Sequence, residues 1–119
     1  MTQNAINKIL VAHKKWINDE EGGSRADFRG EDLMGADLTG ADIRGADIDY
    51  SCWPLWCGSL DVKIDRRIFC QLAYHLCRVI VDDDDCKAAQ LMLGKIANEF
   101  HRVDECGRVP ETPKEDNDG

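Results

Sequence analysis

A five-residue period is the feature of this sequence that most constrains its fold. Five consecutive repeats, from Ala26-Asp-Phe-Arg-Gly to Ala46-Asp-Ile-Asp-Tyr, follow one another without a slip. Asp takes the second place of every repeat, a large apolar residue takes the third, and Gly ends four of the five. A period of five fits neither the 3.6 residues of an α-helix nor the two of a strand. It therefore predicts a chain that turns a corner once per repeat.

The residue types indicate how each corner forms. A small first residue and a large third residue, two apart, point to the same side of an extended segment, so both are expected to face a narrow interior. Gly permits the positive φ that tight corners need, and Asp readily accepts hydrogen bonds from backbone amides at turns. Glu31 departs from the pattern because it stands at an inward position. The predicted interior residues are Phe28, Leu33, Leu38, Ile43 and Ile48.

These repeats resemble the pentapeptide-repeat family, whose consensus is close to A-[D/N]-L-x-x. The resemblance covers residues 26–50, and it extends to residue 60 if 51–55 and 56–60 are degenerate repeats. It implies a right-handed quadrilateral β-helix with four repeats per coil, or about one and a half coils here. The expected fold class is mixed α+β, with this short solenoid flanked by an N-terminal helix and a C-terminal helical hairpin.

The flanking segments show helical periodicity. Residues 3–18 place Ile6, Leu10, His13 and their neighbours on one face, and Thr2 is a candidate N-cap. Two further apolar stripes predict helices over 66–81 and 86–103, separated by an acidic run. The expected organisation is a helix and linker (1–25), the solenoid with a degenerate end (26–60), the hairpin (61–106) and a flexible tail (107–119).

Catalytic and metal motifs are weak. No Ser/His/Asp arrangement or phosphate loop has a defensible spacing, so we expect no enzyme and no cofactor. Six cysteines in a chain without a signal-like start indicate free thiols in a reducing cytoplasm. The x₄ spacing from Cys52 to Cys57 leaves a zinc or thiol-redox alternative open, although it lies at the edge of the usual zinc range. No apolar run is long enough to span a membrane.

The distribution of charge indicates which kind of partner the chain can bind. The formal net charge is −8, with −5 on residues 26–50 and −4 on residues 81–106. This balance argues against direct binding to nucleic acid or to an anionic membrane, and it suits a basic protein partner. Trp residues after the repeats are a second candidate surface. The candidate partner-binding residues are Asp32, Asp37, Asp42, Asp47, Asp49, Asp82, Asp83, Asp84, Asp85, Trp53 and Trp56.

Three functional hypotheses follow, besides the zinc or thiol-redox protein that the cysteines leave open. The first is a non-enzymatic, phage-type inhibitor, anti-CRISPR or anti-restriction, that blocks the basic nucleic-acid-binding surface of its target by DNA mimicry. The second, which the family resemblance implies, is a protein that protects DNA gyrase or another topoisomerase. The third is a scaffolding module that binds through the Trp and hairpin surfaces. A homodimer, formed through the hairpin or an open coil end, is expected in each case.

Overall fold

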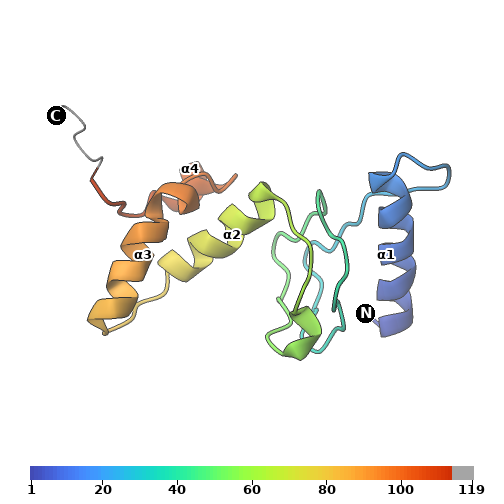
Figure 1. Cartoon of the computed structure of the whole chain (residues 1–119), viewed down its shortest axis with the longest axis horizontal. Helices are drawn as coiled ribbons and strands as arrows, with labels where there is room; N and C mark the ends of the chain where they lie inside the picture. Colours follow the sequence, from blue (N-terminus) through green and yellow to red (C-terminus); the bar gives the residue numbers. More distant parts are fainter. Residues whose placement is uncertain (114–119) are drawn as a thin grey trace. The chain divides into compact units, whose positions relative to one another are not determined.

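The chain forms two compact units, Met1–Asp65 and Arg66–Gly119. A computed structural model describes residues 1–113 of it (Figure 1). The first is called here the N-terminal unit and the second the C-terminal unit. Each is described by itself.

The predicted first helix is present as α1, Gln3–Ile17. It begins at Thr2, whose side-chain oxygen accepts a hydrogen bond from the Ala5 N–H at 3.1 Å. The helix contains three lysines and no acidic residue, and two of the lysines lie in the last turn, where they interact favourably with the helix dipole. Figure 1 shows α1 running alongside the loops of the same unit.

Each five-residue repeat closes a turn of the same kind. The carbonyl of the third residue accepts a hydrogen bond from the N–H of the next repeat's first residue, as in Ala41 to Leu38 at 2.8 Å and Ala46 to Ile43 at 2.9 Å. The fifth residue has positive φ in all five repeats, between 62° and 93°. Four of these residues are Gly, and the fifth is Tyr50. The position of Gly in the sequence is therefore explained by backbone conformation.

The conserved place of Asp within the repeats is explained by the same turn. In every repeat the Asp carboxylate accepts a hydrogen bond from the N–H two residues later, at 2.9–3.2 Å. This bond satisfies a backbone donor that no strand partner reaches. The third residues fill the interior between the turns, and Phe28, Leu33, Leu38, Ile43 and Ile48 are all buried, as predicted.

Residues 26–45 and 46–65 run side by side in parallel. Isolated bridges join Asp27 to Asp47, Asp32 to Cys52 and Asp42 to Lys63. Backbone bonds between them include Leu33 N–H to the Cys52 carbonyl at 3.2 Å and Lys63 N–H to the Ala41 carbonyl at 2.8 Å. The pairing therefore continues beyond the last recognisable repeat.

The predicted quadrilateral β-helix is wrong. Across residues 1–113 the chain forms no strand and no sheet, and its regular structure is helical, with loops between the helices. The physical reason is the short period. A turn interrupts the chain every five residues, so each bridge stays isolated and the bridges do not join into a ladder.

Side chains on the inner face of α1 hold it against the turns. Buried His13 accepts a hydrogen bond from the Ala26 N–H at Nδ1 (2.9 Å), so its proton lies on Nε2 and is donated to the Arg44 carbonyl at 2.8 Å. The Gln3 carboxamide donates to the Asp37 carbonyl (2.9 Å) and accepts from the Asp37 N–H (2.8 Å). These contacts satisfy backbone groups that the turns leave unpaired.

The C-terminal unit is helical. It contains α2 (Arg66–Cys77), α3 (Asp84–Ala97) and α4 (Val103–Cys106), and α2 packs on α3. Both longer helices end before their predicted limits. The Asp83 side chain caps α3 by accepting a hydrogen bond from the Cys86 N–H at 2.9 Å. The helix ends at Ala97, with Asn98 as its C-cap. The buried core consists of Ala73, Tyr74, Ala97, Phe100 and Val109.

The segment after α4 is packed on this core. The Asn98 side chain donates to the Val109 carbonyl at 2.9 Å and accepts from its N–H at 2.8 Å. The Tyr74 hydroxyl donates to the Gly107 carbonyl at 2.6 Å. The first part of the expected tail is thus docked, while residues 114–119 lie outside the described residues. No helix within residues 1–113 is long and apolar enough to cross a membrane.

The turn geometry predicts the effect of adding a side chain at Gly40. Gly40 has φ +68° and open space around its absent Cβ, so Gly40→Ala meets no steric clash and only the backbone conformation is penalised. We expect a loss of about 1 kcal/mol in the free energy of unfolding, measured by urea denaturation. Met34→Ala, at the exposed fourth place of the preceding repeat, is the control and should change stability by less than about 0.5 kcal/mol. Equal effects would contradict the turn assignment.

The docking of α1 predicts a larger effect at His13. His13→Leu removes the two hydrogen bonds of the imidazole. The Ala26 N–H and the Arg44 carbonyl then face a buried leucine side chain without a hydrogen-bond partner. We expect a loss of roughly 2–4 kcal/mol in unfolding free energy. Lys15→Leu, on the exposed side of the same helix, should be nearly neutral. A His13 variant as stable as the Lys15 variant would show that α1 does not depend on these bonds.

Candidate interaction surface

The structure separates the predicted acidic residues into groups with different surroundings. Asp42 is the most enclosed, with 5% of its side chain exposed. Arg44 donates to both of its carboxylate oxygens at 2.6 and 2.9 Å, and the Lys14 ammonium lies 3.6 Å away. The hydrogen bonds from Arg44 hold the pKa of Asp42 well below its usual range. Asp42 is therefore part of the scaffold and is not available to a partner.

Other repeat carboxylates are also occupied. The Asp27 carboxylate binds the Arg29 guanidinium at 2.8–2.9 Å, and this contact lowers the pKa of Asp27 to about 2. Asp47 is half-buried, with the same guanidinium 3.6 Å away, and Asp49 is buried. The two arginines thus lie against three carboxylates of the repeat, while residues 26–50 keep a net charge of −5.

Asp32 and Asp37 remain exposed in the N-terminal unit. Their carboxylates accept the turn hydrogen bonds from Met34 and Thr39, and the bonds from Thr39 lower the pKa of Asp37. No cation interrupts this part of the chain, because residues 30–43 and 45–62 contain no Lys or Arg.

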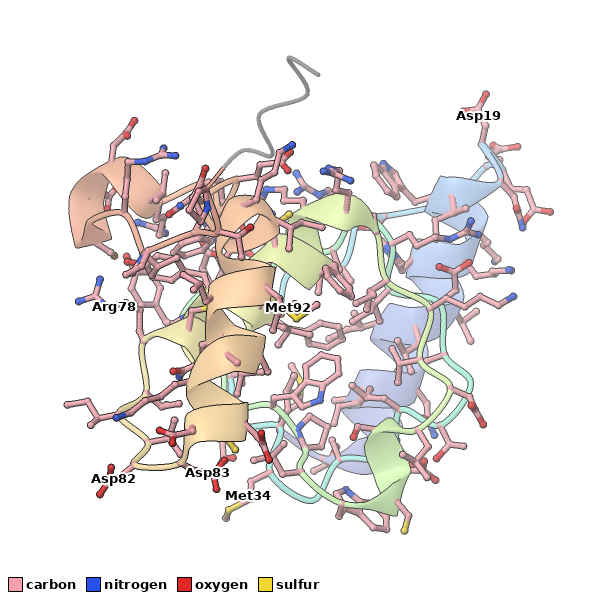
Figure 2. The ribbon with its side chains drawn as sticks, turned by 60° about the vertical axis from the view of Figure 1, so that its left-hand side comes forward. Asp19, Met34, Arg78, Asp82, Asp83 and Met92 are labelled. Carbon is pink, nitrogen blue, oxygen red and sulfur yellow. The ribbon has the colours of Figure 1, made fainter. Side chains whose placement is uncertain are left out.

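The run from Asp82 to Asp85 is exposed, but it belongs to the C-terminal unit. Asp83 caps α3, and the hydrogen bond from the Cys86 N–H lowers its pKa. Asp82 lies 3.7 Å from the Lys87 ammonium. Figure 2 shows Asp82 and Asp83 at the start of this helix. The acids of the repeat belong to the other unit.

The two predicted Trp residues also differ. Trp53 is half-buried, whereas Trp56 is 49% exposed. The Trp56 indole N–H donates to the Ala36 carbonyl at 2.9 Å, so its ring is fixed while one side faces solvent. Trp56 is thus the better placed of the two to contact a partner.

Two exposed apolar residues on neighbouring segments were not among the predicted partner-binding residues. Met34 is 74% exposed and Leu55 is 90% exposed. They lie on adjacent segments, because Cys52 N–H bonds to the Glu31 carbonyl at 3.1 Å and Trp56 bonds to Ala36. Figure 2 shows the Met34 side chain projecting from its loop. The signal was present for Met34, which takes the fourth, outward place of its repeat.

These exposed residues lie on two segments that are joined by backbone and Trp56 hydrogen bonds, and we call them the corner patch. The corner patch combines large apolar side chains with two carboxylates, on segments that contain no cation. Within the described part of the chain, no group of three or more His, Cys, Asp or Glu side chains is arranged to hold a metal. The corner patch consists of Asp32, Met34, Asp37, Leu55 and Trp56.

Comparison with known proteins identifies the repeat. The family model described as pentapeptide repeats (8 copies) matches residues 24–49. This segment is a pentapeptide repeat. No curated protein and no solved structure matches the chain. The pentapeptide repeat points to a protein-interaction module, and the corner patch lies on it and on the segment that pairs with it.

The ion pair of Asp42 predicts a specific pH dependence. Because the pKa of Asp42 is lowered in the folded protein, the pair stabilises the fold above the ordinary Asp pKa of about 4, and this contribution is lost as the pH falls. Asp42→Asn keeps an oxygen for the turn but loses the charge. We expect it to cost about 1–2 kcal/mol at pH 7, and the difference from wild type to shrink steadily below pH about 4.

Chemical denaturation across this pH range measures the effect. Asp32→Asn is the control, since exposed Asp32 makes the same turn bond without an ion pair among the described residues. It should change stability little at either pH. A pH-independent cost of Asp42→Asn would show that the ion pair does not stabilise the fold.

Proposed function

We propose that this chain is a non-enzymatic binding protein that inhibits a nucleic-acid-handling protein by occupying its basic surface through the corner patch. The observation that carries the proposal is the patch itself: exposed Met34, Leu55 and Trp56 edged by Asp32 and Asp37. Large exposed apolar groups in a small protein mark contact sites, and Trp is frequent among the residues that dominate binding energy.

Charge supports a basic partner. The corner patch lies within two cation-free stretches of a chain whose net charge is −8. Surfaces of opposite charge associate faster and reject wrong partners more strongly than neutral ones. Proteins that bind DNA or RNA carry such basic surfaces because they must contact phosphates. A CRISPR effector, a restriction enzyme and a topoisomerase are therefore the target classes to examine.

The placement of the carboxylates favours one mode of contact over another. A mimic of the phosphate backbone needs a row of unpaired negative charges. In this repeat, Asp27 and Asp42 are paired with Arg29 and Arg44, and Asp49 is buried. We therefore propose an apolar contact with an acidic edge, in which Asp32 and Asp37 orient the partner, instead of continuous DNA mimicry.

A displacement assay tests the proposal. Purified Cas nucleases, restriction enzymes and DNA gyrase are each bound to a fluorescent DNA duplex, and the protein is titrated in. We expect release of the duplex from at least one enzyme. Met34→Ser/Leu55→Ser should weaken the inhibition by on the order of tenfold or more. Asp32→Asn/Asp37→Asn should weaken it less and reduce its dependence on salt, while each Asn keeps its turn oxygen.

The control is Ile80→Ser, which removes a fully exposed apolar side chain from the C-terminal unit. It should inhibit as well as wild type. Inhibition that survives loss of the patch residues would place the contact elsewhere. Binding without release of DNA, unaffected by salt, would favour the scaffolding function instead.

A further inference from the structure

The N-terminal unit carries a second charged surface, of opposite sign, on the outer face of α1. Lys8, Val11 and Lys15 follow at helical spacing and are all exposed, with Val11 at 59%. They line a shallow hollow of about 390 Å³ together with Asn7, Ala12 and Gly22. We call Lys8, Val11 and Lys15 the basic stripe.

The basic stripe is available for contact because α1 docks through other residues. His13 and Gln3, on the inner side, make the bonds to the turns. Among residues 1–113, neither the Lys8 nor the Lys15 ammonium has a carboxylate within ion-pair distance. With no acidic residue in α1, nothing on the helix offsets this charge.

The basic stripe and the corner patch are complementary. One presents an apolar side chain between two ammonium groups, and the other presents apolar side chains beside two carboxylates. We infer that the basic stripe of one copy binds the corner patch of a second copy. The inference rests on the corner patch of the proposed function, but it needs no external target.

The stripe and the patch are different surfaces of one copy. Two copies can therefore make the contact twice, once in each direction about a two-fold axis, or each copy can bind two neighbours head to tail. The net charge of −8 on each copy opposes it, and the Debye length of about 8 Å at physiological salt leaves mainly the local attraction. We expect a weak contact, with a dissociation constant on the order of 100 µM.

Self-association also regulates the proposed function. A patch covered by a neighbour's α1 is not open to a target, so the two occupants compete. At high protein concentration the free patch is a smaller fraction of the total. A basic target that binds more tightly than α1 displaces the second copy.

Analytical ultracentrifugation of the full chain from 10 µM to about 1 mM tests the inference. Two variants each disable one side. Lys8→Glu/Lys15→Glu reverses the stripe, and Met34→Lys/Leu55→Lys places cations in the patch without touching the turn carboxylates. Each variant alone should be monomeric. An equimolar mixture should form a 1:1 heterodimer and nothing larger, because one intact stripe then meets one intact patch.

The chain carrying all four substitutions should stay monomeric, since neither surface is then intact and the two new lysines only offset Asp32 and Asp37. The control is Lys87→Glu/Lys95→Glu, which makes the same charge change on α3 and should associate like wild type. Circular dichroism and thermal unfolding check that every variant folds.

Several results would overturn the inference. They are a wild type that is monomeric at every concentration, a mixture of the two variants that does not associate, and association that survives either variant. None of these results depends on the displacement assay. Failure to self-associate leaves inhibition by the monomer standing, and failure to inhibit leaves self-association standing.

Discussion

The turn that closes after every five residues is the constraint on which the N-terminal unit depends. Each turn holds one backbone hydrogen bond across the corner and one from the Asp carboxylate to an N–H two residues later. Both bonds are local, so each turn closes within its own repeat and the first residue of the next. The buried column from Phe28 to Ile48 and the exposed corners at Met34 and Leu55 both follow from this regular turning.

The sequence allowed the buried residues and α1 to be predicted because each depends on a period that residue types reveal. The five-residue period alone did not justify the prediction of a quadrilateral β-helix. A strand needs consecutive residues that pair along one neighbour, and a turn at every fifth residue prevents this. The pairing beyond residue 60 escaped prediction because backbone bonds, such as that from Lys63 N–H to the Ala41 carbonyl, leave no pattern in side chains.

The acidic residues show why composition is a weak guide to a binding surface. Every repeat Asp serves the turn, and the difference between them lies in what else is near. Arg44 encloses Asp42 and Arg29 binds Asp27, whereas Asp32 faces solvent beside Met34. The sequence places Asp32 and Asp42 in identical positions of the repeat. The fourth residue of the repeat makes the difference: it is Arg44 beside Asp42 and Met34 beside Asp32, so this part of the distinction could have been predicted from the sequence.

The same arrangement explains how an acidic chain can present two surfaces of opposite sign. Lysines gather on α1, acids gather on the turns, and the bonds of His13 and Gln3 keep the helix on one side of the unit. Neutralisation within the unit is therefore incomplete, and the unsatisfied charges lie beside exposed apolar groups. A target and a second copy both bind such a surface through opposite charge and apolar contact. The two therefore compete for the same residues.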